Sequence, residues 1–213
     1  EKEMPFRLTE ITNREKARLE KLYPGRFQFK ENRNAADYVY NRSDLANLIG
    51  RSYNGKRNHI RHFKKDHPDY QFIPLTKEWI EPSRIRLEEW YESRGVENDP
   101  SLRSERQALM DALDHFGILN FQGAIIVVDD EIQAFTMGEP ISDKMVCIHF
   151  EKANAEIQGI YPTINQDFVN HFWSDYEYIN RAEDMGLPGL RKAKMDYKPA
   201  YLEMKYDVLE PLT

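Results

Sequence analysis

Two residues that can transfer protons stand close together in the apolar stretch KMVCIHFEKA, residues 144–153. His149 and Glu151 are two positions apart, and residues two apart on a β-strand point to the same face. An imidazole or carboxylate held there can take a proton from an attacking hydroxyl or amine. The same pair can also do no more than orient a polar network. We therefore predict His149 and Glu151 as catalytic residues and leave open which of them is the general base.

The segment YINRAEDMGLPGLRKAKMDYKPA, residues 178–200, gathers many different polar residues between two apolar stretches. Binding residues concentrate in connections that a rigid scaffold holds, although Gly, Pro and charged residues also make ordinary solvated turns. An arginine beside paired carboxylates can bind both ends of an amino acid. On the binding alternative, the Asn-Arg pair fixes a polar or anionic group, and one of the two acids receives an ammonium. The predicted substrate-binding residues are Asn180, Arg181, Glu183, Asp184, Lys192 and Tyr197, of which the last two could equally pack a short helix.

The stretch GKRNHIRHFKKDHP, residues 55–68, is strongly basic in a chain whose formal net charge is −6. Arg57, Arg61 and Lys64 are three and four positions apart, so they share one face of a helix. Such a face suits phosphates of RNA, of an anionic lipid or of a nucleotide-bearing donor. An ordinary exposed helix explains the same charges. We predict Arg57, Arg61 and Lys64 as polyanion-binding residues, with tRNA among the partners.

The composition of the 213 residues narrows the class of protein. One cysteine, Cys147, excludes an internal disulfide framework and a Cys-rich zinc site, and the spacing of the six histidines predicts no metal ligands. The single cysteine favours a reducing, cytoplasmic setting, and no apolar run reaches the roughly 20 residues that cross a bilayer. The glycine-rich nucleotide loops, the nucleophile elbow and the HExxH motif are absent. The chemistry must therefore come from another kind of site.

Elements that position these residues can be predicted from periodicity and from helix caps. The first half predicts a strand at 5–11, short strands at 27–29 and 37–40, and a strand at 70–75. It also predicts helices at 13–22, 42–50, 55–68, 76–93 and 101–116. The second half predicts a hairpin within 121–141, strands at 144–153, 176–180 and 201–209, and helices at 161–173 and 188–194. Strands followed by helix, strand, helix and strand indicate an α+β domain.

Three long blocks of the sequence resemble a known bacterial family, the C-terminal domains of phosphatidylglycerol lysyltransferases. They are YVYNRSDLANLIGRSYNGKRNHIRHFKKDHPDYQF (38–72), HFEKANAEIQGIYPTINQDF (149–168) and YINRAEDMGLPGLRKAKMDYKP (178–199). Members of this family look like tandem GNAT-like (acyl-CoA N-acyltransferase) domains and are similar to the Fem-type aminoacyltransferases. The resemblance implies an incomplete N-terminal GNAT-like domain with the basic connecting helix at 1–69, and a C-terminal GNAT-like domain at 70–213. We accordingly expect the chain to be the later part of a longer one.

The resemblance also implies a chemistry. An aminoacyl or acyl group would move from a donor, aminoacyl-tRNA or acyl-CoA, to a hydroxyl or amine of a small-molecule or lipid-headgroup acceptor. The closely spaced glycines of the GNAT pyrophosphate loop are missing from EKANAEIQGIYP, which argues against coenzyme A, and no flippase region accompanies the chain. The alternative is a noncatalytic module of the same fold that binds an amino acid or nucleic acid.

Overall fold

The computed structural model describes residues 8–209, which form two compact units. The first unit contains the described residues up to Asn41 together with those from Asn180 onward, and the second is Arg42–Ile179. The predicted domain boundary between residues 69 and 70 stays a prediction, because a compact unit and a family domain need not coincide. Each unit is considered by itself below.

The first unit is built on three antiparallel strands. Strand β8 (Tyr201–Leu209) lies between β1 (Ile11–Thr12) and β2 (Gln28–Asn41), and helices α1 (Asn13–Leu22) and α7 (Pro188–Met195) belong to the same unit. Thr12 caps α1 through a reciprocal capping box with Glu15, as its residue type favours. Residues 5–7 of the strand predicted at 5–11 lie outside the described residues, residues 8–10 are not in a strand, and β1 begins only at Ile11.

Strand β2 replaces the two short strands predicted at 27–29 and 37–40. It runs without interruption for 14 residues from Gln28 to Asn41, and its pairing with β8 shifts between Asn32 and Asp37. Residues 30–34 are all polar, so the alternation of apolar and polar residues that predicts a strand is absent from the middle of β2. A bulge absorbs the extra residues while the two ends of the strand stay paired.

The second unit contains an antiparallel sheet between helices. Its strands run in the order β6-β5-β4-β3, and β7, which begins in this unit, lies on the other side of β6. The bounds of these strands are β3 (Gln71–Pro74), β4 (Gln122–Val128), β5 (Glu131–Pro140), β6 (Met145–Ala153) and β7 (Tyr178–Asn180). The helices are α2 (Arg42–Asn47), α3 (Asn54–Asp66), α4 (Lys77–Ser93), α5 (Pro100–Asp114) and α6 (Ile160–Phe172), with short turns η1 (Arg51–Tyr53) and η2 (Val96–Asn98).

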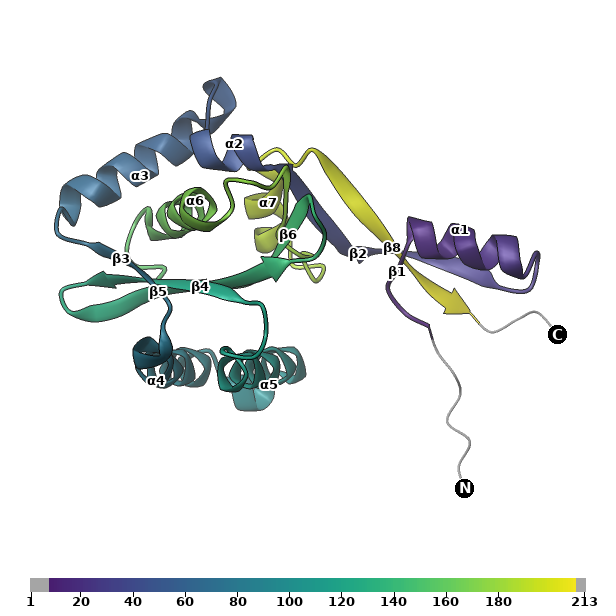
Figure 1. Cartoon of the computed structure of the whole chain (residues 1–213), viewed down its shortest axis with the longest axis horizontal. Coiled ribbons are helices and arrows are strands. Elements are labelled where there is room, and N and C mark those ends of the chain that lie inside the picture. The colour runs from purple at the N-terminus through teal and green to yellow at the C-terminus, as the bar shows by residue number, and fades with distance from the viewer. Residues whose placement is uncertain (1–7, 210–213) are drawn as a thin grey trace. The chain divides into compact units, whose positions relative to one another are not determined.

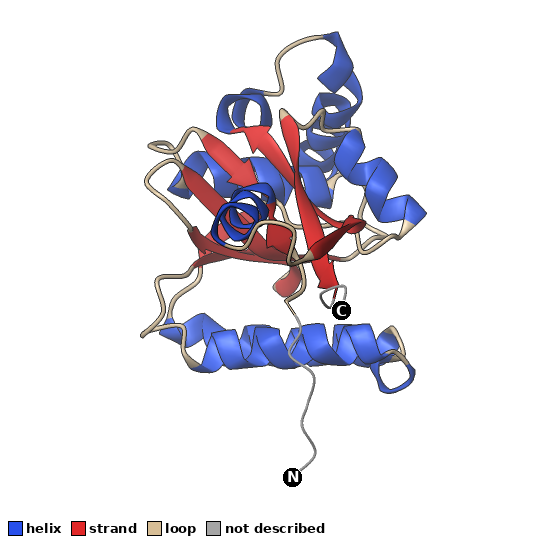
Figure 2. Cartoon of the chain, turned by 90° about the vertical axis from the view of Figure 1, so that its right-hand side faces the viewer, coloured by secondary structure: helices blue, strands red, loops and turns tan. Residues whose placement is uncertain are grey.

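Helices cover both faces of this sheet. Figure 1 shows α6 on one side of strands β4 and β5 and the α4–α5 pair on the other, and Figure 2 shows the chain with its helices in blue and its strands in red. One apolar cluster joins Leu87, Leu109 and Phe135 on the α4–α5 side, whereas another joins Ile126 and Ile164 on the α6 side. The sheet therefore separates two cores, and a side chain on β6 belongs to one or the other.

Two turns show why particular residues occupy positions with positive φ angles. Asp129 and Asp130 both have positive φ angles, of 51° and 61°, as a tight hairpin between β4 and β5 requires. Gly159 has φ of 87° at the start of α6, where an added Cβ would lie 2.2 Å from the backbone oxygen of His59. Only glycine permits this approach of α6 to α3. Within residues 8–209, no helix is both long and apolar enough to cross a membrane.

Candidate functional site

A bulge on β6 displaces the predicted catalytic histidine from the regular ladder. Ile148 pairs with Gly138 and Phe150 pairs with Met137, so His149 has no opposite residue on β5. A Cβ on Gly138 would lie 2.4 Å from the backbone oxygen of Cys147, so this crossing point requires glycine. Bulges re-aim side chains and are frequent beside active sites.

The imidazole of His149 lies in a small polar group on the α4–α5 side of the sheet. Its Nε2 atom is 3.2 Å from Glu139 Oε1, and its Nδ1 atom is 3.7 Å from Cys147 Sγ. The ring also contacts Phe121 edge-on, with the centroids 5.8 Å apart. The side chain remains 34% exposed, so a ligand can reach it. A histidine oriented by a carboxylate is an arrangement that general bases use.

Glu151 does not share a face with His149, and that prediction is wrong. Glu151 lies opposite Thr136 and accepts a hydrogen bond of 2.9 Å from Asn165 on α6. The bulge at His149 breaks the alternation of side chains, which the spacing of two assumed. The two predicted catalytic residues therefore lie on opposite faces of the sheet, and the carboxylate of Glu139 lies beside His149.

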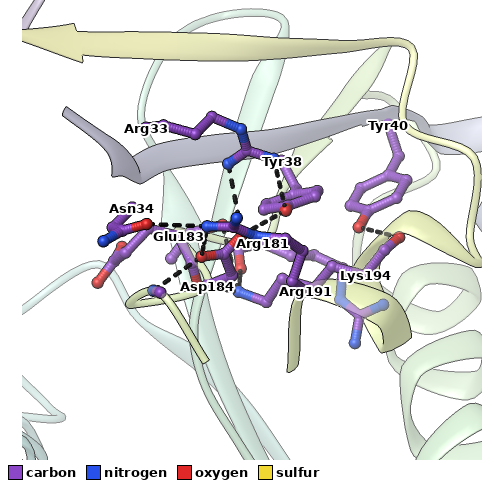
Figure 3. A network of polar contacts seen from close by, with 11 residues as sticks. Arg33, Asn34, Tyr38, Tyr40, Arg181, Glu183, Asp184, Arg191 and Lys194 are labelled. Carbon is purple, nitrogen blue, oxygen red and sulfur yellow. Dashed lines mark hydrogen bonds and ion pairs between the residues drawn. The ribbon is translucent and has the colours of Figure 1, made fainter. Parts of the chain in front are cut away.

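In the first unit, the carboxylate of Asp184 is the centre of a polar network (Figure 3). Its side chain is fully buried, and Arg191 donates two hydrogen bonds to it, of 2.7 and 2.9 Å. Arg33, the hydroxyl of Tyr38 and the backbone N–H of Gly186 also donate to it. The bonds from Arg191 contribute most to holding the pKa of Asp184 well below its usual range. This carboxylate is ionised and enclosed by donors of the protein itself.

The ammonium of Lys194 holds the backbone of the same loop. It donates to the carbonyl oxygens of Arg181, Ala182 and Glu183, and the side chain is buried. Ala182 and Met185 have positive φ angles of 54° and 53°, an uncommon conformation for residues other than glycine. Asp184 and Lys194 thus fix a strained loop between β7 and α7, and strained backbone clusters at functional sites.

The other predicted substrate-binding residues fall at different depths. Asn180 is buried and donates to Asp37 over 2.9 Å, and Tyr197 is buried beside the guanidinium of Arg181, 4.8 Å from its ring centroid. The Tyr40 ring lies 5.8 Å from the same guanidinium. Lys192 is exposed, and Glu183 is half-buried. The structure brings Arg181 and Tyr197 into contact, whereas their predicted roles toward a ligand stay predictions.

The predicted polyanion-binding residues surround a hollow on α3 and α6, which we call the basic hollow. It has a volume of about 490 Å³ and is lined by Asn47, Arg57, Ile60, Arg61, Lys64, Lys65 and Gln166. None of these lining residues is acidic. Arg57 donates to the carbonyl oxygens of Leu48 and Gly50, and Lys64 lies 3.5 Å from Asp167, so both also have structural partners. Lys65, which the prediction omitted, forms no ion pair with any residue in 8–209.

Sequence reasoning also missed the partners that orient the candidates. Glu139 lies ten positions before His149, and Arg33 lies 151 before Asp184, so no local spacing relates them. Gly138 beside Glu139 was the available signal, since an isolated glycine within a strand indicates a bulge or a close backbone approach. The candidates are divided between the two units.

Comparison with known proteins connects this geometry to a family. The family model described as "Phosphatidylglycerol lysyltransferase, C-terminal" matches residues 1–209. A crystal structure of a conserved protein of unknown function from Bacteroides thetaiotaomicron is 40% identical, with a TM-score of 0.91 over 98% of this chain and 70% of that one. The structure of L-PGS from Bacillus licheniformis is 14% identical, with a TM-score of 0.64 over 95% of this chain and 66% of that one.

An uncharacterized protein of Mycoplasmoides gallisepticum is 23% identical over 176 residues, which are 81% of this chain and 55% of that protein. The chain thus spans little more than half the length of this curated relative. The likeness to L-PGS concerns the fold alone, and the order of strands and helices confirms the predicted α+β class. Because the family model covers the chain from residue 1 to residue 209, the chain belongs to the family of the phosphatidylglycerol lysyltransferase C-terminal domains.

Proposed function

We propose that this protein is an aminoacyl or acyl transferase of the cytoplasm that acylates a hydroxyl or amine acceptor. The observation that carries the proposal is the half-exposed imidazole of His149, held by Glu139 at a bulge in the middle of the sheet. Membership of the lysyltransferase family supports the same class of reaction. In this proposal Glu139 replaces Glu151 as the partner of the general base.

The hydrogen bonds of His149 define its part in the reaction. With a proton on Nε2, the imidazole donates to Glu139, and its Nδ1 atom is the basic one. The acceptor displaces the long contact between Nδ1 and Cys147 Sγ, and Nδ1 then takes the acceptor's proton as the acceptor oxygen or nitrogen bonds to the donor's carbonyl carbon. The bond from that carbon to the donor's oxygen or sulfur then breaks, and the leaving group receives the proton that Nδ1 took from the acceptor. Glu139 stabilises the imidazolium between these steps.

The donor is an aminoacyl-tRNA or an acyl-CoA, both of which carry phosphates. The basic hollow supports this part of the proposal, because its four cations line about 490 Å³ without a carboxylate among the lining residues. Arg61 and Lys65 are exposed there and suit phosphate contact. The acceptor is a small molecule or a lipid headgroup. Within the first unit we retain the loop residues as candidates for ligand binding, with Arg181 on a polar or anionic group and Glu183 on an ammonium.

The test measures transfer by the intact protein from a panel of labelled aminoacyl-tRNAs and acyl-CoAs. We expect His149→Gln to lower the transfer rate by about 100-fold, a usual contribution of a general base, and Glu139→Gln to lower it less. His115→Gln is the matched control, because His115 is an exposed histidine at the end of α5. Melting curves establish that each variant is folded.

Two results would overturn the proposal. The first is full transfer by folded His149→Gln protein, which would remove the imidazole from the reaction. The second is saturable binding of a donor without transfer to any acceptor, which would instead support the noncatalytic binding module.

A further inference from the structure

A separate cavity lies at the end of the sheet in the second unit, beside the C-terminal half of α4. Its volume is about 410 Å³, within the usual range of small-ligand sites, roughly 300 to 1,000 Å³. Leu87, Trp90 and Phe135 give it an apolar floor, and residues at the start of β5 and after β6 complete the wall. Neither His149 nor Glu139 lines it, so it is distinct from the proposed catalytic group.

The charged residues of this cavity divide into paired and unpaired ones. Arg86 on α4 forms an ion pair of 2.9 Å with Glu89, and Lys152 on β6 forms one of 2.7 Å with Glu105. Arg94 and Glu156 also line the cavity, and neither forms an ion pair with another residue in 8–209. Once the internal pairs are set aside, one cation and one anion remain available to a ligand.

Two cations lie near the Trp90 ring, and within residues 8–209 Lys152 is held by an ion pair whereas Arg94 is not. Lys152 Nζ lies 4.5 Å from the ring centroid and is held by Glu105, and its side chain is only 13% exposed. The guanidinium of Arg94 lies 5.3 Å from the same centroid, and its side chain is exposed. A cation–π contact at an exposed site is weak, whereas a guanidinium bound to a carboxylate by two hydrogen bonds is stronger. Arg94 can therefore leave the ring for the carboxylate of a ligand.

We propose that this cavity binds a free amino acid with an apolar side chain. Arg94 binds its carboxylate, Glu156 binds its ammonium, and the side chain lies on Leu87, Trp90 and Phe135. The net charge around the cavity is zero, because three cations line it and three carboxylates balance them. The cations are Arg86, Arg94 and Lys152, and the carboxylates are Glu89, Glu156 and Glu105, the partner of Lys152. A neutral surrounding suits a zwitterion better than a phosphate dianion. The site stands independently of the transferase proposal.

The polar wall favours a small ligand with donors and acceptors at one end. Asn154 donates from its side chain to Gln133 over 3.1 Å and accepts from the backbone N–H of Glu156 over 3.0 Å. These bonds fix the turn that carries Glu156, so its position relative to β5 is set before a ligand arrives. A preformed wall lowers the ordering cost of binding.

Isothermal titration calorimetry of the intact protein with L-phenylalanine and L-leucine tests this site. We expect saturable binding of one molecule, and about tenfold weaker binding in Arg94→Gln and in Glu156→Gln, since each loses one charge-assisted contact. The matched controls are Arg51→Gln and Glu92→Gln, which remove exposed charges outside the cavity. Ser93→Phe, which places a ring at the cavity wall, should abolish binding with the rest of the site unchanged.

Analogues of phenylalanine separate the zwitterion from other ligands. We expect 3-phenylpropionate, without the ammonium, and phenethylamine, without the carboxylate, each to bind about tenfold more weakly than L-phenylalanine. Equal binding of either analogue would overturn the proposal, as would tighter binding of AMP. Absence of binding by any of the 20 amino acids at about 10 mM, far above usual small-ligand dissociation constants, would also overturn it.

Discussion

Arginine and lysine side chains have different partners in two regions of this molecule, the network around Asp184 and the basic hollow. Around Asp184, two partly exposed arginines donate to an enclosed carboxylate, and the buried Lys194 donates to backbone carbonyl oxygens. Around the basic hollow, four cations and no acid are among the residues that line an open surface, although Lys64 also lies 3.5 Å from Asp167 outside the lining. Residue type alone does not distinguish these regions. The difference is that Asp184 pairs with both of its arginines, whereas Arg61 and Lys65 in the hollow form no ion pair with any residue in 8–209.

The enclosed region should therefore respond to substitution by losing stability, and the open region by losing binding. When a buried carboxylate is removed, its hydrogen-bond donors are left without an acceptor, and this lowers the free energy of unfolding. An exposed cation without a protein partner leaves nothing behind. The following variants test this division in order of decreasing effect on the free energy of unfolding.

Replacement of Asp184 by alanine should have the largest effect. We expect a loss of about 3 kcal/mol in the free energy of unfolding, because Arg191 and Tyr38 lose a fully buried acceptor. Chemical denaturation measures it. Glu183→Gln is the matched control, because Lys194 donates to the backbone carbonyl of Glu183, which the substitution keeps. This variant should change the free energy of unfolding by less than about 0.5 kcal/mol. Equal losses in both variants would show that the network adds little.

Replacement of Lys194 by methionine should destabilise the protein by about 2 kcal/mol. Methionine keeps much of the apolar stem, but three carbonyl oxygens, of Arg181, Ala182 and Glu183, lose their donor. Two of the loop residues hold positive φ angles, so the loop should also relax. Amide exchange across residues 181–186 should speed up in this variant and not in Lys192→Met, whose lysine is exposed. Unchanged amide exchange in Lys194→Met would refute the proposal that Lys194 holds the backbone of this loop.

The pH dependence of stability should reveal Asp184 separately. Its pKa in the folded protein is depressed by Arg191, whereas an unfolded aspartate titrates near 3.9. The stabilisation is therefore complete above about pH 5 and is lost as the pH falls toward 2, by up to about 1.4 kcal/mol per pH unit. The stability difference between the wild type and Asp184→Asn should shrink over that interval. A constant difference would mean that Asp184 binds no extra proton on unfolding.

The sequence predicted much of the fold because most of its elements have local signatures. The 3.6-residue periodicity predicted α4 and α5, and paired aspartates predicted the hairpin between β4 and β5. Strand β2 was divided in two, since its middle residues are polar and only pairing with β8 keeps them extended. Tertiary pairing decided the outcome there, and local propensity did not.

The candidate site was less accessible to sequence reasoning. His149 was correctly placed on a strand, but its direction depends on a bulge that arises only when β5 lies alongside. Asp184 was selected for its charge, yet its burial depends on Arg33 and Tyr38, which are remote in the sequence. Spacing within one segment contains no information about such partners.

The smallest effect on stability, and a large one on binding, should come from Arg61→Ala with Lys65→Ala in the basic hollow. Both side chains are exposed, so the free energy of unfolding should change by less than about 0.5 kcal/mol. Affinity for tRNA should fall, and the slope of log affinity against log salt should become shallower by about 0.7 to 0.9 for each lost phosphate contact. Arg57 is left in place because it holds the carbonyl oxygens of Leu48 and Gly50.

Arg14→Ala with Arg18→Ala is the matched control, because it removes the same charge from exposed positions on α1. If the net charge alone governed binding, both double variants would weaken tRNA binding equally, and the basic hollow would have no special role. A change confined to the Arg61 and Lys65 variant would instead locate the phosphate contacts there, since a counterion effect depends on which cations meet the phosphates. An unchanged salt slope in that variant would remove the hollow from donor binding and leave its cations as a solvated face of α3.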